Sequence, residues 1–252
     1  MADIAPPTLF TQLRSRLRWA KVQKDPVLIE VKPKPRPHDG KLRATSVRGV
    51  QSMEAALTEL AMLCTKHNIR LTLVAVGNGV LPFFLNQGTL LTIDIVYELV
   101  PAENKKLLNR FVGEIAEKYD TLPRNWLNNG PRIYMEPEVR DILGRESLRY
   151  GKELFCRPGL VVWIPPWKYF FVAKIDELSQ RHLENLTGDE MANAATYLSL
   201  VLREESLKSV SFDKIARWHL QYHKPTRPGF KGVCDATNIA YQRSYHRKPI
   251  IK

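Results

Sequence analysis

A strand–turn–helix–strand unit within residues 71–97 constrains the fold of this 252-residue chain more than any other stretch. The β-prone run 71–76 ends at Gly77-Asn78-Gly79, a short apolar helix can follow, and a second β-rich run spans 92–96. Glycines in a turn before a helix let backbone N–H groups approach a phosphate closely. The second run carries one carboxylate, Asp94, which can hold the magnesium that accompanies a phosphate.

Further helical and strand patterns alternate along the chain. The first helix is expected to begin with Ser52 as its cap and to end at Asn68. Further helices are expected to start at Pro101, Trp167, Asp189 and Asp213, and another strand covers residues 160–164. This alternation predicts an α/β or α+β fold, in which helices flank a small mixed β-sheet.

The net charge of +12 is unevenly distributed. Residues 13–48 hold eleven Lys/Arg against three acids and residues 214–252 hold nine against one, so each stretch carries +8, whereas residues 49–213 carry −3. We therefore divide the chain into a basic, proline-containing arm (1–48), a globular domain (49–213) and a basic tail (214–252). Basic arms commonly bind nucleic acid or another polyanion, because the phosphates they neutralise release counterions.

The cationic side chains of these two extensions are interleaved with prolines or aromatic residues, a composition that suits RNA or another polyanion. A solvated tail or a nuclear targeting signal would have a similar composition. The candidate nucleic-acid-binding residues are Arg14, Arg16, Arg18, Lys32, Lys34, Arg36, Arg243, Arg247 and Lys248.

Cysteine usage and hydropathy predict the compartment. Cys64, Cys156 and Cys234 are odd in number and lack the spacing of metal ligands, which favours thiols in a reducing environment. No apolar run approaches the ~20 residues of a membrane span, and the first residues lack the basic-then-apolar pattern of a signal peptide. We expect an intracellular protein, cytoplasmic or nuclear and not secreted, with no membrane partner.

The unit within residues 71–97 resembles the signature of the nucleotidyltransferase superfamily, in which Gly-Gly or Gly-Ser precedes a short helix and an Asp-x-Asp strand. Gly77-Asn78 stands at the glycine pair, Asp94 at the second Asp and Thr92 at the first. Over residues 52–202 the chain is similar to the nucleotidyltransferase-fold proteins that include the toxins of abortive-infection type IV toxin–antitoxin systems and their uncharacterised relatives.

Further segments follow in the order found in those proteins. Residues 122–128 look like a leucine-proline-x-x-tryptophan-leucine-asparagine loop, and residues 169–175 resemble a helix with a lysine at the position of Lys174. The segment that begins Gly188-Asp189 lies where relatives have Arg-Asp-x-x-Asp. Four positions of the pattern are replaced: its arginines by Gly88 and Gly188, and its aspartates by Thr92 and Ala192.

The resemblance implies a site for a nucleoside triphosphate with magnesium. Asp94 would be the metal ligand and a catalytic carboxylate, and Glu98 would be a substitute for the missing acid. The implied nucleotide-binding residues are Gly77, Asn78, Gly79, Thr92, Lys174 and Asp189.

Each of these residues also has a purely structural explanation. The glycine turn can exist without a ligand, and Asp94 can end a strand facing water. Lys174 can extend its amine to solvent beside an apolar helix face. Asp189 can orient Lys174 or serve only the helix N-terminus.

Three functions remain open from the sequence. Two-metal phosphoryl transfer needs carboxylates that bridge both ions, so the replaced aspartate favours a degenerate active site in a nucleotide- or nucleic-acid-associated binding module. The first alternative is an active metal-dependent nucleotidyltransferase acting on RNA or protein. The second is a structural or interaction protein whose basic arms dock an acidic partner.

Overall fold

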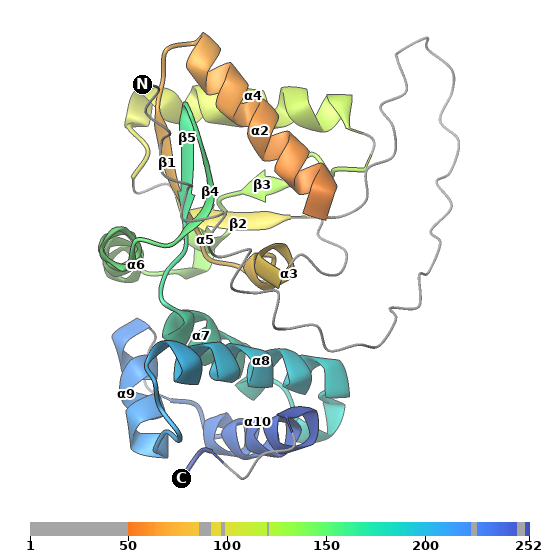
Figure 1. Ribbon diagram of the computed structural model, residues 1–252, viewed down its shortest axis with the longest axis vertical. Helices are drawn as coiled ribbons and strands as arrows, with labels where there is room; N and C mark the ends of the chain where they lie inside the picture. Colours follow the sequence, from red (N-terminus) through yellow and green to blue (C-terminus); the bar gives the residue numbers. More distant parts are fainter. Residues whose placement is uncertain (1–49, 86–91, 97–98, 120, 223–225, 246–249) are drawn as a thin grey trace, which may run out of the picture.

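A five-stranded mixed sheet forms the upper half of the computed structural model, which describes residues 50–85, 92–96, 99–119, 121–222, 226–245 and 250–252 (Figure 1). The strand order is β3-β2-β1-β5-β4. β1 runs antiparallel to β2 and parallel to β5, β2 is parallel to β3, and β4 is antiparallel to β5. The predicted mixed sheet is therefore confirmed. The strands are β1 (Leu71–Ala75), β2 (Ile93–Val96), β3 (Leu127–Asn128), β4 (Glu153–Arg157) and β5 (Leu160–Trp163).

Strand β1 lies at the centre of the sheet because its side chains are apolar on both faces. Leu71, Leu73, Val74 and Ala75 are fully buried. A strand covered on both faces reads as a nearly continuous apolar run, which is the pattern of this segment. β1 therefore ends in the interior of the molecule, and the turn after this strand has neighbouring elements on both sides.

Several helices surround the sheet. α2 (Val50–Lys66) and α4 (Ala102–Lys118) contact each other, and Figure 1 shows both beside the upper part of the sheet. α3 (Val80–Leu85) follows β1 directly, as predicted. α5 (Pro131–Tyr134) contacts β2, and α6 (Pro137–Tyr150) contacts β1.

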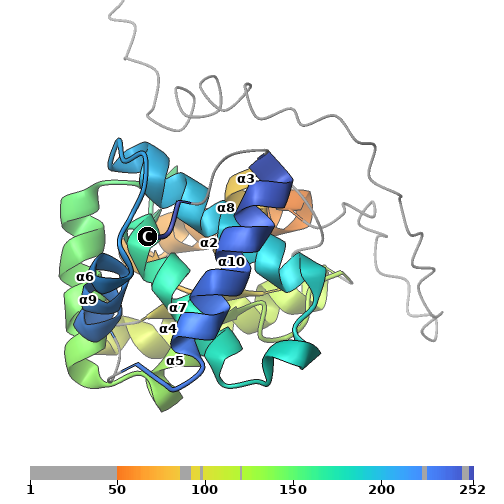
Figure 2. The same cartoon turned by 90° about the horizontal axis from the view of Figure 1, so that it is seen from below.

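The C-terminal half is helical. α7 (Trp167–Ser179) contacts α8 (Gly188–Glu204), α9 (Phe212–Tyr222) and α10 (Phe230–Tyr245), and the 3-10 turn η2 (Leu183–Asn185) lies between α7 and α8. Seen from below, α10 passes across the face of this group and α9 lies next to α6 (Figure 2). None of the described helices is both long enough and apolar enough to cross a membrane.

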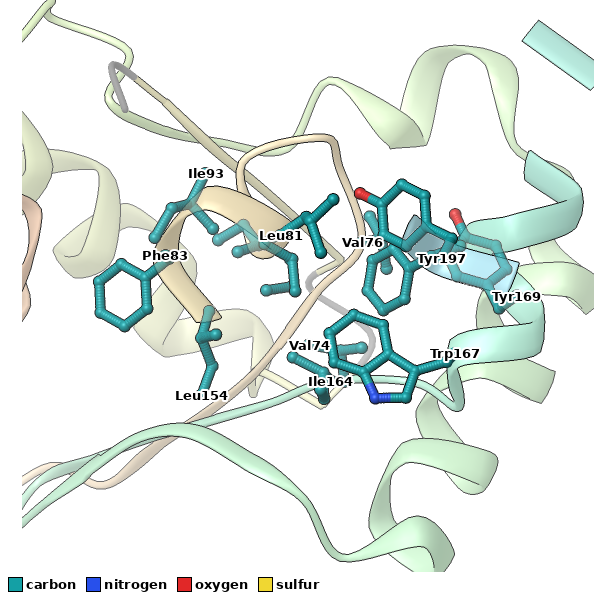
Figure 3. Packing of buried hydrophobic residues seen from close by; sticks show 14 of the residues in the cluster. Val74, Val76, Leu81, Phe83, Ile93, Leu154, Ile164, Trp167, Tyr169 and Tyr197 are labelled. Atoms are coloured by element: carbon teal, nitrogen blue, oxygen red, sulfur yellow. The ribbon is translucent and has the colours of Figure 1, made fainter. Parts of the chain in front are cut away.

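One hydrophobic core joins the sheet to the helical half. Figure 3 shows Val74 of β1 and Ile164 beside Trp167, at the start of α7. The Trp167 ring lies 4.8 Å from that of Phe84, measured between centroids, and Tyr197 of α8 stacks on Phe170 at 5.8 Å. The two halves are consequently held in a fixed relation by apolar packing.

The helix start predicted at Ser52 is wrong. Ser52 lies inside α2, is 1% exposed, and its Oγ accepts a hydrogen bond from Thr121 Oγ1 at 3.3 Å. Asn68 does follow the end of this helix, with a left-handed φ of 53°. Ser52 therefore bonds to the turn at residues 121–122 and does not cap the helix.

The basic tail predicted over residues 214–252 is wrong for the residues that the structure describes there. α9 and α10 bury Trp218, Phe230 and Tyr241 among others. At the C-terminus, Val210 and Ile251 form a parallel bridge, and Asn238 Oδ1 accepts hydrogen bonds from two backbone N–H groups there. Among the cations described there, Lys214 and Arg217 lie on α9, and Lys231 and Arg243 lie on α10, so they belong to helices of the fold rather than to a tail.

The start of α8 is capped by a reciprocal pair. Thr187 Oγ1 accepts a hydrogen bond from the Glu190 N–H, and the Glu190 carboxylate accepts one from the Thr187 N–H at 2.9 Å. These bonds, with a salt bridge from Arg181, lower the pKa of Glu190 to about 2.

Candidate functional site

The turn after β1 lies against Asp94 on the neighbouring strand. The Val76 N–H donates to the backbone carbonyl of Asp94 at 2.9 Å, and the Val80 N–H closes the turn by donating to the Gly77 carbonyl at 3.2 Å. A Cβ on Gly77 would lie 2.6 Å from Asp94 Cβ and 2.7 Å from its Cγ. Glycine is required here because the Asp94 side chain occupies the space that any other side chain would need.

Asp94 is half-buried and positioned by an amide. Its Oδ1 accepts a hydrogen bond from Asn128 Nδ2 at 2.8 Å, across the parallel pair of β2 and β3. Asn128 Oδ1 in turn accepts from the Gly130 N–H at 2.8 Å, which sets the orientation of the amide. The carboxylate therefore has one oxygen held by an amide and the other directed at the Gly77 turn.

Lys174 is connected to this turn through the carboxylate of Glu177, which was not among the predicted site residues. The Lys174 side chain is 8% exposed and its Nζ lies 2.8 Å from Glu177 Oε1, one helical turn further along α7. The other oxygen of Glu177 accepts a hydrogen bond from Asn78 Nδ2 at 3.3 Å. A buried ammonium requires such a partner, and here the pair also connects α7 to the glycine turn.

The charges of Asp94 and Glu177 influence the pKa values of three tyrosines. Tyr134 of α5 is 72% exposed, yet the pKa of its phenol is raised, by partial desolvation and by the negative charges of Asp94 and Glu177. Burial raises the pKa of Tyr169, with added effects of Tyr134 and Asp94, and burial together with Glu177 raises the pKa of Tyr197. Both carboxylates therefore act on the same tyrosine hydroxyl, that of Tyr134.

The buried pair of phenols has a common orientation. Figure 3 shows Tyr169 and Tyr197 side by side, with both hydroxyl groups pointing away from Trp167. The rings belong to α7 and α8 and pack in the shared core. Their hydroxyls are thus carried by helices that pack in the core.

The structure brings together most of the predicted nucleotide site. Gly77, Asn78, Asp94 and Lys174 meet at the end of β1 through the contacts given above. Thr92 is half-buried and directly precedes β2. Because side chains alternate between the two faces of a strand, Thr92 is expected on the same face as Asp94, two residues further on. Gly79 is half-buried within the turn, and its carbonyl accepts a hydrogen bond from the Phe83 N–H at 3.3 Å.

Two predicted residues stand apart from this group. Asp189 is exposed in the first turn of α8, and the ion pair of Lys174 goes to Glu177, so of the two roles considered for Asp189 its position fits the one at the helix N-terminus. Glu98, predicted as the substitute carboxylate, lies outside the described residues.

One of the predicted nucleic-acid-binding residues lies within the described part of the chain. Arg243 is exposed on α10. The other eight lie outside the described residues: Arg14, Arg16, Arg18, Lys32, Lys34, Arg36, Arg247 and Lys248.

Sequence reasoning missed Glu177 and Asn128. Glu177 follows Lys174 by three residues on a helix, a spacing that favours an ion pair. The sequence therefore did contain an indication of this pair. Asn128 ends the loop of residues 122–128 and gave no indication on its own, because its role depends on the pairing of β3 with β2.

Asp94 is the carboxylate that would hold a magnesium ion at this turn. Magnesium in nucleotide sites commonly takes one or two carboxylates plus substrate oxygens, whereas the two oxygens of Glu177 are bonded to Lys174 and Asn78. An ordered metal pair needs more, and the described residues contain no cluster of three or more His, Cys, Asp or Glu side chains that could hold a metal.

In comparisons with known proteins, no family model, no curated protein and no solved structure matches the chain.

Proposed function

We propose that the protein is a nucleotide-binding module with a nucleotidyltransferase-like arrangement and a degenerate active site. The observation that carries the proposal is the contact between the Asp94 carboxylate and the Gly77 turn, to which Glu177 and Asn78 attach Lys174. A tight glycine turn, a carboxylate and a buried ammonium are the groups that a magnesium–triphosphate needs. The sequence resemblance to nucleotidyltransferases supports the same assignment.

Each residue has a definite role in this proposal. Asp94 would hold the magnesium, which neutralises phosphate charge when bound. Lys174 would exchange its contact with Glu177 for a phosphate oxygen, because a compact ammonium binds either anion as a point charge. Tyr134, exposed on α5, would cover the ligand from that side. Transfer is not expected, because Thr92 offers no carboxylate to bridge a second ion.

Calorimetric titration of the full chain with each of the four nucleoside triphosphates, with and without magnesium, tests the proposal. We expect magnesium-dependent binding that weakens about tenfold or more in Asp94→Asn, the effect of losing one charge-assisted contact. The matched control is Asp141→Asn, which changes an exposed carboxylate on α6. Absence of binding by every triphosphate, or equal losses in both variants, would refute it.

A second candidate function is metal-dependent nucleotidyl transfer. The observation in its favour is that a second carboxylate, Glu177, accepts a hydrogen bond from Asn78 in the turn that Asp94 contacts. Labelled triphosphates incubated with RNA and with protein acceptors would show incorporation, which should disappear in Asp94→Asn and fall in Glu177→Gln. No incorporation with magnesium or manganese would leave the binding module as the function.

Nucleic-acid binding by the basic N-terminal arm is a further part of the proposal. Because α9 and α10 belong to the fold, only residues 1–49 can be removed without cutting the described core. If the arm contacts phosphates, RNA should bind the full chain more tightly than residues 50–252. The slope of log affinity against log salt should also become shallower by roughly 0.7–0.9 per lost phosphate contact. Equal slopes would contradict this role, and equal binding to polyglutamate would favour docking of an acidic partner.

A further inference from the structure

A second pocket lies between α4 and the loop of residues 124–129. Its volume is about 360 Å³, which lies within the range of small-molecule sites. Its apolar lining consists of Val112 and Leu127, and its polar lining consists of amides and two cations. The lining residues are Lys105, Asn109, Val112, Arg124, Asn125, Leu127, Asn128 and Asn129.

The walls of this pocket are held at a fixed distance by Trp126. The indole is fully buried, and its Nε1 donates to the Val112 carbonyl of α4 at 3.0 Å. The Trp126 carbonyl accepts from the Ile93 N–H of β2 at 2.7 Å. On the helix side, Lys105, Asn109 and Val112 recur at spacings of four and three, which places them on one face. The pocket is therefore formed in the absence of a ligand.

The charge of the pocket is positive. Lys105 and Arg124 line it, no acid does, and within the described ranges neither cation has a carboxylate partner. By contrast, the hollow of about 450 Å³ between α2 and α4 includes Glu54 and Glu59 in its lining. A cationic, acid-free concavity favours an anion, and a guanidinium presents paired donors that match phosphate geometry.

The amides indicate what else the ligand carries. Asn125 and Asn129 supply both donors and acceptors at the lining. The Oδ1 of Asn129 is buried and, among the residues that the structure describes, receives no hydrogen bond. An unpaired buried amide oxygen is costly, so rotation of this amide toward a hydroxyl group in the pocket would be favourable.

We propose that this pocket binds a small phosphate ester bearing hydroxyl groups, of the sugar-phosphate class. Lys105 and Arg124 contact the phosphate, and the asparagines contact the hydroxyls. The site is distinct from the one at the Gly77 turn, since Gly77, Asn78 and Lys174 do not line it. Asn128 is shared: it lines the pocket and donates to Asp94, so a ligand here adjoins the carboxylate of the first site.

The test is titration of the full chain with ribose 5-phosphate, with inorganic phosphate, ribose and acetate as comparison probes. We expect saturable binding of ribose 5-phosphate below about 1 mM, the weak end of the usual range for substrates. Inorganic phosphate should bind more weakly, and ribose and acetate weaker still. Equal binding of inorganic phosphate and ribose 5-phosphate would overturn the sugar-phosphate assignment. Failure of every probe to saturate would overturn the site itself.

Substitutions of the lining cations test whether ribose 5-phosphate binds in this pocket. Lys105→Met and Arg124→Gln should each weaken ribose 5-phosphate about tenfold, as expected for one charge-assisted contact. Lys106→Met, which removes an exposed cation next along α4, is the matched control and should have no effect. Equal losses in Lys105→Met and Lys106→Met would refute the location. Lys174→Met should weaken magnesium–triphosphate binding without weakening ribose 5-phosphate, because Lys174 does not line this pocket, so the two proposals can fail independently.

Discussion

Replacing Gly77 by alanine should force β1 and β2 apart where they carry the candidate nucleotide site. The added Cβ would lie 2.6 Å from Asp94 Cβ and 2.7 Å from its Cγ, far inside van der Waals contact. Overpacking of this kind costs about 1–3 kcal/mol of unfolding free energy. For a chain of this size, each kcal/mol lowers Tm by about 2–4 °C.

A double-mutant cycle separates this steric cause from other roles of the glycine. In an Asp94→Ala background the cost should persist, because the Cβ of residue 94 is itself within 2.6 Å of the new methyl group. In an Asp94→Gly background the obstruction is gone. Gly77 has no left-handed φ, so alanine is then tolerated and can even stabilise by about 0.4–1 kcal/mol.

Urea unfolding of the single and double variants measures the coupling energy of the cycle. Gly113→Ala is the matched control, since a Cβ there meets nothing within 4 Å and the residue lies in the middle of α4. It should stabilise the protein by about 0.5–1 kcal/mol. If Gly77→Ala costs the same with Asp94→Gly as in the parent protein, the close approach is not the reason for the glycine.

Three further predictions concern thiols, pH and the metal. Burial raises the pKa values of Cys64 and Cys234 to about 11 and about 12, so a thiol reagent at pH 8 should label only the exposed Cys156 in the native protein and all three in urea. The depressed pKa of Glu190 implies a contribution to stability that is complete above the unfolded pKa of about 4.3; it is lost as pH falls toward about 2. The unfolding free energies of the parent and of Glu190→Gln should therefore converge in acid. Thr92→Asp adds a carboxylate two residues before Asp94, and should lower the magnesium concentration needed for half-maximal triphosphate binding; an unchanged midpoint would contradict the assigned geometry.

Local patterns predicted the elements that carry the site. The β-rich run before Gly77 and the apolar positions after Trp167 are found as β1 and α7, with ends shifted by a few residues. Residues within one element, such as Gly77 and Asn78 in their turn, follow from spacing and turn chemistry. The expected meeting of Asp94 with the glycine turn also holds, because adjacent antiparallel strands place the end of one beside the start of the other.

Contacts between distant segments were not predictable in this way. The bond between Asn78 and Glu177 depends on where α7 docks, which is decided by the packing of Trp167 against Phe84. The charge density after residue 213 was misleading for a related reason. Cations on the exposed face of α10 have the same composition as those of a tail, and only the buried residues of the opposite face, such as Phe230, distinguish the two.

The parallel pairing of β1 with β5 also sets an order of assembly. Leu71 pairs with Leu160, whereas the antiparallel partner of Ala75 is Ile95. The β1–β5 pairing closes a longer loop than the β1–β2 pairing. It therefore costs more chain entropy and is expected to form later. During synthesis, the Gly77 turn and Asp94 can therefore meet while α7 has yet to emerge. Lys174 and Glu177 arrive later with the second half of the chain, so an interrupted or truncated product would present Asp94 and the glycine turn without the Lys174–Glu177 pair.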